Sequence, residues 1–292
     1  MSKSELYISN ESLVTQINKG SNSNLIMFGV PFDVTSTYRT GSRFGPNYIR
    51  EAFTNIEIYS KRLAVDLETV NIKDLGNIMK TGKLTEMNKM VQEITNEIIT
   101  NKKIPGILGG DHSLTNGSVR AYDKCNMIVF DAHLDMRNEF EGLKLSHATF
   151  LRRLIEDNKI NKLIHVGTRA ATKEEWDFAE ENNTTIINMD EIQNIVEVIK
   201  KFKAETNREK WYVSIDLDVV DPAYAPGVGN PEANGMTSRE ILEFIYALKK
   251  TEIIGFDIVE LIPNHDNGST SALAARLLAE LFCIIHYQHT RK

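Results

Sequence analysis

The chain has 292 residues, of which 41% are hydrophobic and 25% charged, so it can bury a sizeable core and has the composition of a globular protein. Its net charge of −6 argues against a nucleic-acid partner, because phosphate binding requires a clustered basic surface, and is compatible with a cationic ligand. Its two cysteines, Cys125 and Cys283, lack CxxC spacing and argue against a disulfide framework or a zinc-thiolate site.

The N-terminal segment, residues 1–24, is polar and lacks the apolar stretch of a signal peptide, and nowhere do 18 apolar residues follow one another. We therefore expect a cytoplasmic protein that does not associate with a membrane. No later stretch has the composition of a linker, a repeat or a low-complexity tract. The sequence therefore predicts a single domain over residues 1–292, in which the polar segment precedes the first strand.

Short apolar runs typical of buried strands recur along the chain, and helical patterns separate many of them. The strands are expected at residues 25–30, 104–108, 127–131, 163–166, 185–188, 212–215 and 253–259. Helices are expected near residues 47–53, 83–100, 113–122 and 270–286. Further helix starts are indicated by the capping pairs Thr172 with Glu175, Asp190 with Gln193, and Thr237 with Glu240. The alternation predicts an α/β fold with a largely parallel sheet.

Three of the expected strands, 104–108, 127–131 and 212–215, lead into acidic and imidazole side chains. Open parallel sheets place their sites beyond the carboxyl ends of strands, so we expect these side chains to converge. The set comprises four carboxylates and two imidazoles: Asp131, Asp135, Asp216, Asp218, His112 and His133. Helix capping and core packing would each account for one such residue, but they do not account for six together.

The six side chains suit a bridged pair of divalent cations better than one zinc ion, which usually takes three protein ligands in a catalytic site. Two divalent cations would also cancel the charge of about four carboxylates in a partly buried place. Oxygen-rich ligation with a minority of imidazole and no thiolate favours Mn²⁺ over Zn²⁺, with Ni²⁺ as an alternative. The sequence therefore predicts two Mn²⁺ per subunit.

The sequence resembles the ureohydrolase family of arginases, agmatinases and their relatives, which are metal-dependent hydrolases of guanidino compounds. The resemblance runs from about residue 25 to the C-terminus and is carried by the stretches GVPFD, RFGPNYIREA, GGDHS, DAHLD, SHAT, SIDLDVVDP, APG and VE. It implies a three-layer α/β/α fold with a largely parallel sheet of about eight strands. It also implies a dinuclear Mn²⁺ centre and a homo-oligomer, commonly a trimer or a hexamer.

The resemblance assigns the ligands to individual ions. It makes Asp131 and Asp216 the bridging carboxylates, with His112 and Asp135 completing one ion and His133 and Asp218 the other. Water held between two cations is acidified to hydroxide, the nucleophile that a resonance-stabilised guanidinium carbon requires.

Two further residues complete the site that the resemblance implies. Glu260 corresponds to the glutamate that binds the guanidinium, which bare metal ions would repel. His147 corresponds to the catalytic histidine that passes a proton to the leaving amine, a role suited to the pKa of imidazole, and Asp135 shares that task. For Glu260 the alternative is an ordinary surface acid at a strand end.

Two positions depart from the family pattern. Asn230 stands where a threonine usually follows the glycine of the APGxGT stretch, and Asn234 stands where glycine is common. Asn230 can still donate and accept hydrogen bonds near the guanidinium.

The loop between DAHLD and His147, residues 136–146, is short, as in agmatinases. Its Glu139 and Glu141 can attract a terminal ammonium, whereas Arg137 and Lys144 can instead hold a carboxylate.

The predicted function is therefore hydrolysis of agmatine to putrescine and urea, a reaction of polyamine biosynthesis. Guanidinobutyrate, arginine and guanidine are alternative substrates. A metal-binding regulatory protein without turnover is an alternative of another class, and the presence of every ligand, of His147 and of Glu260 argues against it.

Overall fold

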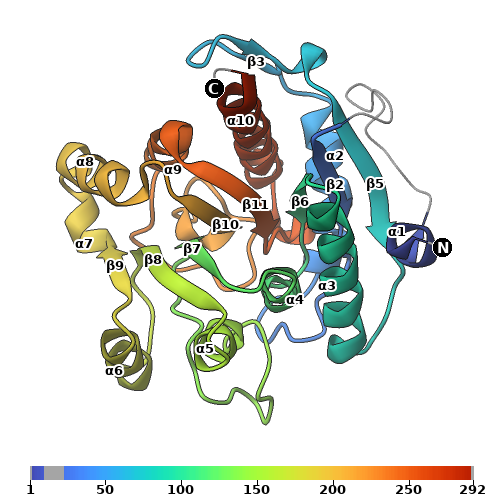
Figure 1. Cartoon of the computed structure of the whole chain (residues 1–292). Helices are drawn as coiled ribbons and strands as arrows, with labels where there is room; N and C mark the ends of the chain where they lie inside the picture. The colour runs from blue at the N-terminus through green and yellow to red at the C-terminus, as the bar shows by residue number, and fades with distance from the viewer. Residues whose placement is uncertain (1, 10–22, 291–292) are drawn as a thin grey trace.

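A nine-stranded sheet lies at the centre of the protein, whose computed structural model describes residues 2–9 and 23–290 (Figure 1). Across the sheet the strands are β1 (Ile8–Ser9), β5 (Ile72–Ile78), β2 (Leu25–Gly29), β6 (Ile104–Leu108), β11 (Glu252–Val259), β10 (Lys210–Asp216), β7 (Cys125–Phe130), β8 (Ile160–Thr168) and β9 (Thr185–Asn188). Every neighbouring pair is parallel except β1 with β5. A separate antiparallel pair joins β3 (Tyr59–Ser60) and β4 (Val65–Asp66).

Helices cover both faces of the sheet, which gives the three-layer α/β/α architecture expected from the sequence (Figure 1). One layer contains α3 (Leu84–Thr100), α4 (Leu114–Arg120), α5 (Phe150–Glu156) and α6 (Lys173–Glu181). The other contains α2 (Gly45–Phe53), α8 (Ile195–Thr206), α9 (Ser238–Ala247) and α10 (Ser269–Thr290). The short helices are α1 (Lys3–Tyr7) and α7 (Met189–Ile192), with the 3₁₀ turns η1 (Ser42–Phe44), η2 (Leu67–Thr69), η3 (Leu217–Val219), η4 (Leu248–Lys250) and η5 (Pro263–His265).

The central strands are apolar on both faces because each face packs against helices. In β7, Met127 and Val129 belong to one hydrophobic core, whereas Ile128 and Phe130 belong to the core on the opposite face. This alternation follows from the two-residue repeat of an extended chain.

All seven predicted strands are present, with ends that differ from the prediction by three residues or fewer, and the four predicted helices are present. The prediction missed β5, because Asp74 and Asn77 interrupt its apolar pattern although both are buried, and it also missed the two-residue strands β1, β3 and β4. Residues 2–9 of the predicted polar segment form α1 and β1, whereas residues 10–22 lie outside the described part of the chain.

Two of the three predicted capping boxes are confirmed, at Thr172 and Thr237. The third was wrong, because α7 begins earlier and Asn188, not Asp190, caps it by accepting the backbone N–H of Glu191.

The C-terminal helix α10 is long and apolar enough to cross a membrane by length and composition alone. However, 78% of its apolar window is buried inside the protein, where the helix packs against α2 and α9. Its hydrophobic surface is therefore covered by the protein itself.

A buried ion pair joins α2 to β5. Arg50 is fully buried and binds Asp74 through two hydrogen bonds of 2.8 Å, and it donates a third, of 2.7 Å, to Asn77 Oδ1. Removing one partner of such a pair leaves an uncompensated buried charge, which is strongly destabilising.

We expect Arg50→Met to lower the free energy of unfolding by about 3–5 kcal/mol. The matched control is Arg62→Met, which removes a bidentate pair with Glu243 at the surface and should cost at most about 1 kcal/mol. Urea unfolding of both variants measures the difference. Equal effects would show that burial of Arg50 does not set the strength of its ion pair.

Candidate metal centre and adjoining cavity

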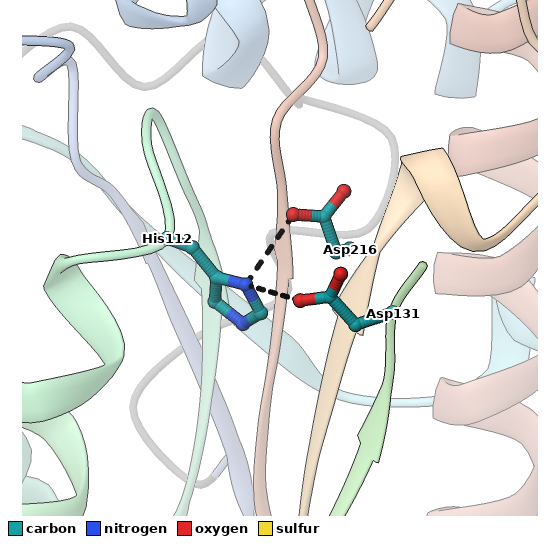
Figure 2. A group of neighbouring side chains, drawn as sticks. All are labelled: His112, Asp131 and Asp216. Carbon is teal, nitrogen blue, oxygen red and sulfur yellow. Dashed lines mark ion pairs between the residues drawn. The ribbon is translucent and has the colours of Figure 1, made fainter. Parts of the chain in front are cut away.

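The predicted ligands meet where neighbouring strands end (Figure 2). His112 lies in the loop after β6, Asp131 directly follows β7, and Asp216 is the last residue of β10. Nδ1 of His112 lies 3.0 Å from Oδ2 of Asp131 and 3.3 Å from Oδ2 of Asp216. These three side chains form a group that could hold a metal ion.

A second such group contains Asp131, His133 and Asp218, so the two groups share Asp131. Nδ1 of His133 lies 3.0 Å from Oδ2 of Asp218 and 3.5 Å from Oδ1 of Asp131. Asp135 adjoins the first group, with Oδ2 3.3 Å from Nδ1 of His112. The structure therefore brings all six predicted ligands together, while Asp216 lies in the first group only.

Backbone N–H groups aim three of the carboxylates. Oδ1 of Asp131 accepts the N–H of His133 at 2.6 Å, and Oδ1 of Asp216 accepts that of Asp218 at 2.8 Å. Oδ1 of Asp218 accepts the N–H of Ala132 at 3.1 Å. In each of these carboxylates, Oδ1 therefore accepts a backbone hydrogen bond and Oδ2 faces a histidine ring.

The hydrogen bonds of His112 determine which ring nitrogen carries its proton. Nε2 lies 2.8 Å from Oγ of Ser214, which donates its single proton to Asp257 at 2.5 Å. Ser214 must therefore accept from Nε2–H of His112, which in the neutral ring leaves a lone pair on Nδ1. Among the described residues, neither Nδ1 of His112 nor Oδ2 of Asp131 has a hydrogen-bond partner. A buried lone pair that faces carboxylate oxygens fits a cation between them.

The electrostatics of the cluster agree with this fit. Burial, together with the neighbouring Asp131, raises the pKa of Asp135 to about 7. Burial and the charges of Asp218 and Asp131 likewise raise the pKa of Asp216 well above its usual range. A divalent cation among these groups would favour their ionised forms, because an opposite charge stabilises a carboxylate.

A cavity of about 150 Å³ adjoins the cluster, and both Glu260 and His147 line it. Glu260 is buried and accepts the backbone N–H of His112 at 2.8 Å through Oε1. Burial and the nearby Asp111 raise the pKa of Glu260 well above its usual range. Burial lowers the pKa of His147 to about 4, so this imidazole is neutral at pH 7.

Two of these site residues have strained backbones, since Asp135 and Glu260 have φ angles of 53° and 66°. Left-handed conformations are uncommon outside glycine and tend to mark functional positions. Asn234 also has a positive φ, of 62°, and an asparagine tolerates this conformation better than most residues. The departure from glycine at position 234 is therefore compatible with the local fold.

The cavity mouth differs from the sequence expectation. Asn230, a predicted substrate contact, lines the cavity, but Glu139 and Glu141 are exposed and are not among its lining residues. Phe140 and Leu143 exchange two backbone hydrogen bonds, which places Glu141 at the tip of a tight turn. The turn directs this part of the loop toward solvent, so the structure does not support the expected contact of the two glutamates with a substrate.

Other side chains line the cavity there, and the sequence analysis had considered only one of them, Arg137, as a contact for the substrate. Glu232 lines the cavity with a side chain that is 44% exposed, and Oε1 lies 3.7 Å from Nε2 of His133. Arg137 lies over the ring of Phe140, and its Nε is 3.6 Å from Oε2 of the buried Glu175. In the sequence Glu175 appears only as a capping residue, so no local pattern indicated this second role.

Arg169 also went unnoticed, although it connects two segments of the site. Its Nη2 donates to the carbonyl oxygens of Asp218, at 2.7 Å, and of Glu232, at 2.9 Å. It thereby holds the segment of Glu232 against η3, which carries a candidate ligand.

Comparisons with known proteins agree with this geometry. The sequence model of the Arginase family matches residues 23–283. The chain is 35% identical to an agmatinase of Bacillus subtilis, over 89% of this chain and 91% of the relative. It is 37% identical to an N(1)-aminopropylagmatine ureohydrolase of Thermococcus kodakarensis, over 88% of each chain. The solved structure of an agmatine ureohydrolase of Thermoplasma volcanium superimposes with a TM-score of 0.88 at 32% identity, covering 96% of this chain and 97% of that one.

The hydrogen bond between Ser214 and His112 leads to a testable prediction. Ser214→Ala should weaken divalent-metal affinity by about 10- to 100-fold, because partners that orient metal-binding histidines contribute on this scale. Thr115→Val is the matched control, since Thr115 donates to the same Asp257 but does not contact His112. Competition with a chelating dye measures both affinities. An unchanged affinity in Ser214→Ala would show that Ser214 does not orient the ligand.

Proposed function

We propose that this chain, which belongs to the arginase family, hydrolyses agmatine to putrescine and urea. It is a ureohydrolase of that family, and its relatives include an agmatinase and an N(1)-aminopropylagmatine ureohydrolase. The observation that carries the proposal is the cavity that adjoins the two candidate ligand groups and is lined by Glu260 and His147.

The metal ligands are those that the resemblance predicted. His112, Asp131, Asp135 and Asp216 would hold one cation, and Asp131, His133 and Asp218 the other. The resemblance adds Asp216 as a further ligand of the second cation. Bound divalent cations would supply a water acidic enough to act as a nucleophile near neutral pH.

The remaining cavity residues bind the guanidinium and move a proton. The buried carboxylate of Glu260 binds the cationic guanidinium, whose charge in turn favours the ionised form of the acid. Asn230 donates and accepts hydrogen bonds beside it. His147 gives a proton to the leaving amine nitrogen, a task that Asp135 shares.

Charge at the cavity mouth favours a substrate with a distal ammonium. The buried Glu175 lies 3.6 Å from Arg137 and partly compensates its charge, whereas Glu232 is an exposed carboxylate. We therefore propose that Glu232, and not Glu139 or Glu141, binds the distal ammonium of agmatine. At this exposure the contact contributes at most about 1 kcal/mol.

Several finer features belong to the same proposal. Mn²⁺ is the preferred cation because the ligands are mainly oxygen atoms, with Ni²⁺ as an alternative. We further propose a single-domain chain that forms a cytoplasmic homo-oligomer, a trimer or a hexamer, and acts in polyamine biosynthesis. Metal analysis of the purified protein tests the identity of the cation, and the mass of the protein in solution tests the oligomeric state.

A urea-release assay tests the main proposal. Chelation should abolish activity and Mn²⁺ should restore it, and agmatine should have a higher kcat/KM than guanidinobutyrate, arginine or guanidine. N(1)-aminopropylagmatine belongs in the panel because a relative is named for it. Full activity in rigorously metal-free protein, or no urea from any of these compounds, would contradict the proposal.

A second assay tests whether Glu232 binds the distal ammonium of agmatine. Glu232→Gln should raise KM for agmatine by up to about fivefold, the equivalent of 1 kcal/mol, while kcat changes little because the contact is equal in ground and transition states. The control is the double variant Glu139→Gln/Glu141→Gln, which should resemble the wild type. If only the double variant changes selectivity, the loop glutamates and not Glu232 bind the agmatine ammonium. If Glu232→Gln loses metal, Glu232 instead orients His133.

A further inference from the structure

A threonine hydroxyl connects a buried aspartate to the proposed proton donor. Thr35, in the loop after β2, is 4% exposed, and its Oγ1 lies 2.9 Å from Oδ2 of Asp111. The same oxygen lies 3.2 Å from Nδ1 of His147 and accepts the backbone N–H of His147 at 3.0 Å. Neither Thr35 nor Asp111 belongs to the candidate ligand set, and no step described above uses them.

The direction of these hydrogen bonds follows from the partners of Asp111. Its Oδ2 faces the N–H and the hydroxyl of Thr35, and its Oδ1 faces the N–H and the hydroxyl of Ser113. The two N–H groups can only donate and the two hydroxyls can donate, so together they suit an ionised Asp111, which is an acceptor only, and these bonds oppose the rise in pKa that its burial causes. Thr35 therefore gives its single hydroxyl proton to Asp111.

With that proton committed, Oγ1 of Thr35 can only accept from His147. Nδ1 of His147 must then carry a hydrogen, and the neutral ring has its lone pair on Nε2. Among the described residues, Nε2 has no hydrogen-bond partner, and the side chain lines the cavity. The nitrogen that is free for chemistry is thus the one that Thr35 does not touch.

We propose that Thr35, held by Asp111, is a positioning residue that keeps His147 in the Nδ1–H tautomer, so that protons are gained and lost only at Nε2. This inference rests on the proposed role of His147 in proton transfer. The neutral ring takes up at Nε2 the proton that the attacking water gives up as its oxygen bonds to the guanidinium carbon. In the protonated ring both nitrogens carry hydrogen, and Nε2–H is the donor to the leaving nitrogen. As the C–N bond breaks, its electron pair goes to nitrogen, nitrogen takes the proton from Nε2, and the ring returns to the neutral Nδ1–H form.

The opposite tautomer of His147 could not exchange a proton with a substrate in the cavity. If Nδ1 held the lone pair, a proton would be taken up on the side of Thr35 and away from the cavity. A buried aspartate that sets a histidine tautomer has a large effect in other enzymes, where the wrong tautomer lowers kcat by several orders of magnitude.

A double-mutant cycle on the full-length, Mn²⁺-loaded protein tests the proposal. His147→Asn should lower kcat by about a hundredfold or more, and Thr35→Val by at least about tenfold, with KM and metal content nearly unchanged. Thr35→Ser is the matched control, because it keeps Oγ and should recover most of kcat. In the His147→Asn background, Thr35→Val should have no further effect beyond about twofold, since the two residues act as one unit.

The cycle overturns the proposal if Thr35→Val has wild-type kcat, or if its effect is as large without His147 as with it. If Thr35→Val fails to fold, nitrogen-15 NMR of ring-labelled histidine in the wild-type protein, loaded with diamagnetic Mg²⁺, decides instead. The His147 signals, identified by their loss in His147→Asn, should report the Nδ1–H tautomer. A predominant Nε2–H tautomer would overturn the inference.

These readouts separate the inference from the proposed function. If the wild type releases no urea from any guanidino compound, the proposed function fails, whereas the NMR measurement still tests the tautomer. If another guanidino compound proves to be the substrate, the same cycle applies to that compound.

Discussion

The structure depends on holding several buried carboxylates close enough to share one cationic centre. Such a cluster is unfavourable by itself, since burial and mutual repulsion raise the pKa of both Asp135 and Asp216. Backbone N–H groups reduce the cost by satisfying one oxygen of each of the strand-end carboxylates Asp131, Asp216 and Asp218. The other oxygen of each is left facing the centre, so the arrangement requires positive charge there.

Rigid neighbours keep the histidines in the form that this centre requires. Hydrogen bonds connect His112 through Ser214 to Asp257, and His147 through Thr35 to Asp111. In both, a hydroxyl whose only proton goes to a buried carboxylate accepts from the ring. The same arrangement has a different consequence for each ring. In His112 it leaves the Nδ1 lone pair facing the carboxylates, and in His147 it leaves the Nε2 lone pair without a hydrogen-bond partner.

Close packing of loops brings these partners together. A Cβ atom on Gly110 would lie 1.7 Å from the carbonyl oxygen of Phe32, so only glycine allows this approach. Asp111 N–H donates to the same oxygen at 2.7 Å, and this contact sets the loop after β2 beside the loop after β6. The position of Thr35 therefore follows from a glycine in another segment.

The sequence alone predicted seven of the strands and the candidate ligand set, because both depend on local patterns. Strand 127–131 is an apolar run followed by ligands at alternate positions, and the parallel sheet makes such strand ends converge. The resemblance to the ureohydrolase family led to His147 and Glu260. The sequence did not determine β5, whose Asp74 looks exposed until Arg50 is placed against it.

Only the tertiary structure decided what surrounds the ligands. Glu139 and Glu141 appeared to be substrate contacts because they lie near His147 in sequence, but a tight turn carries that part of the loop outward. Glu232, Arg169 and Thr35 come from segments far from the DAHLD motif and reach the site through loop packing and hydrogen bonds to carbonyl groups. Such contacts depend on the three-dimensional path of each loop, which hydrophobic periodicity does not encode.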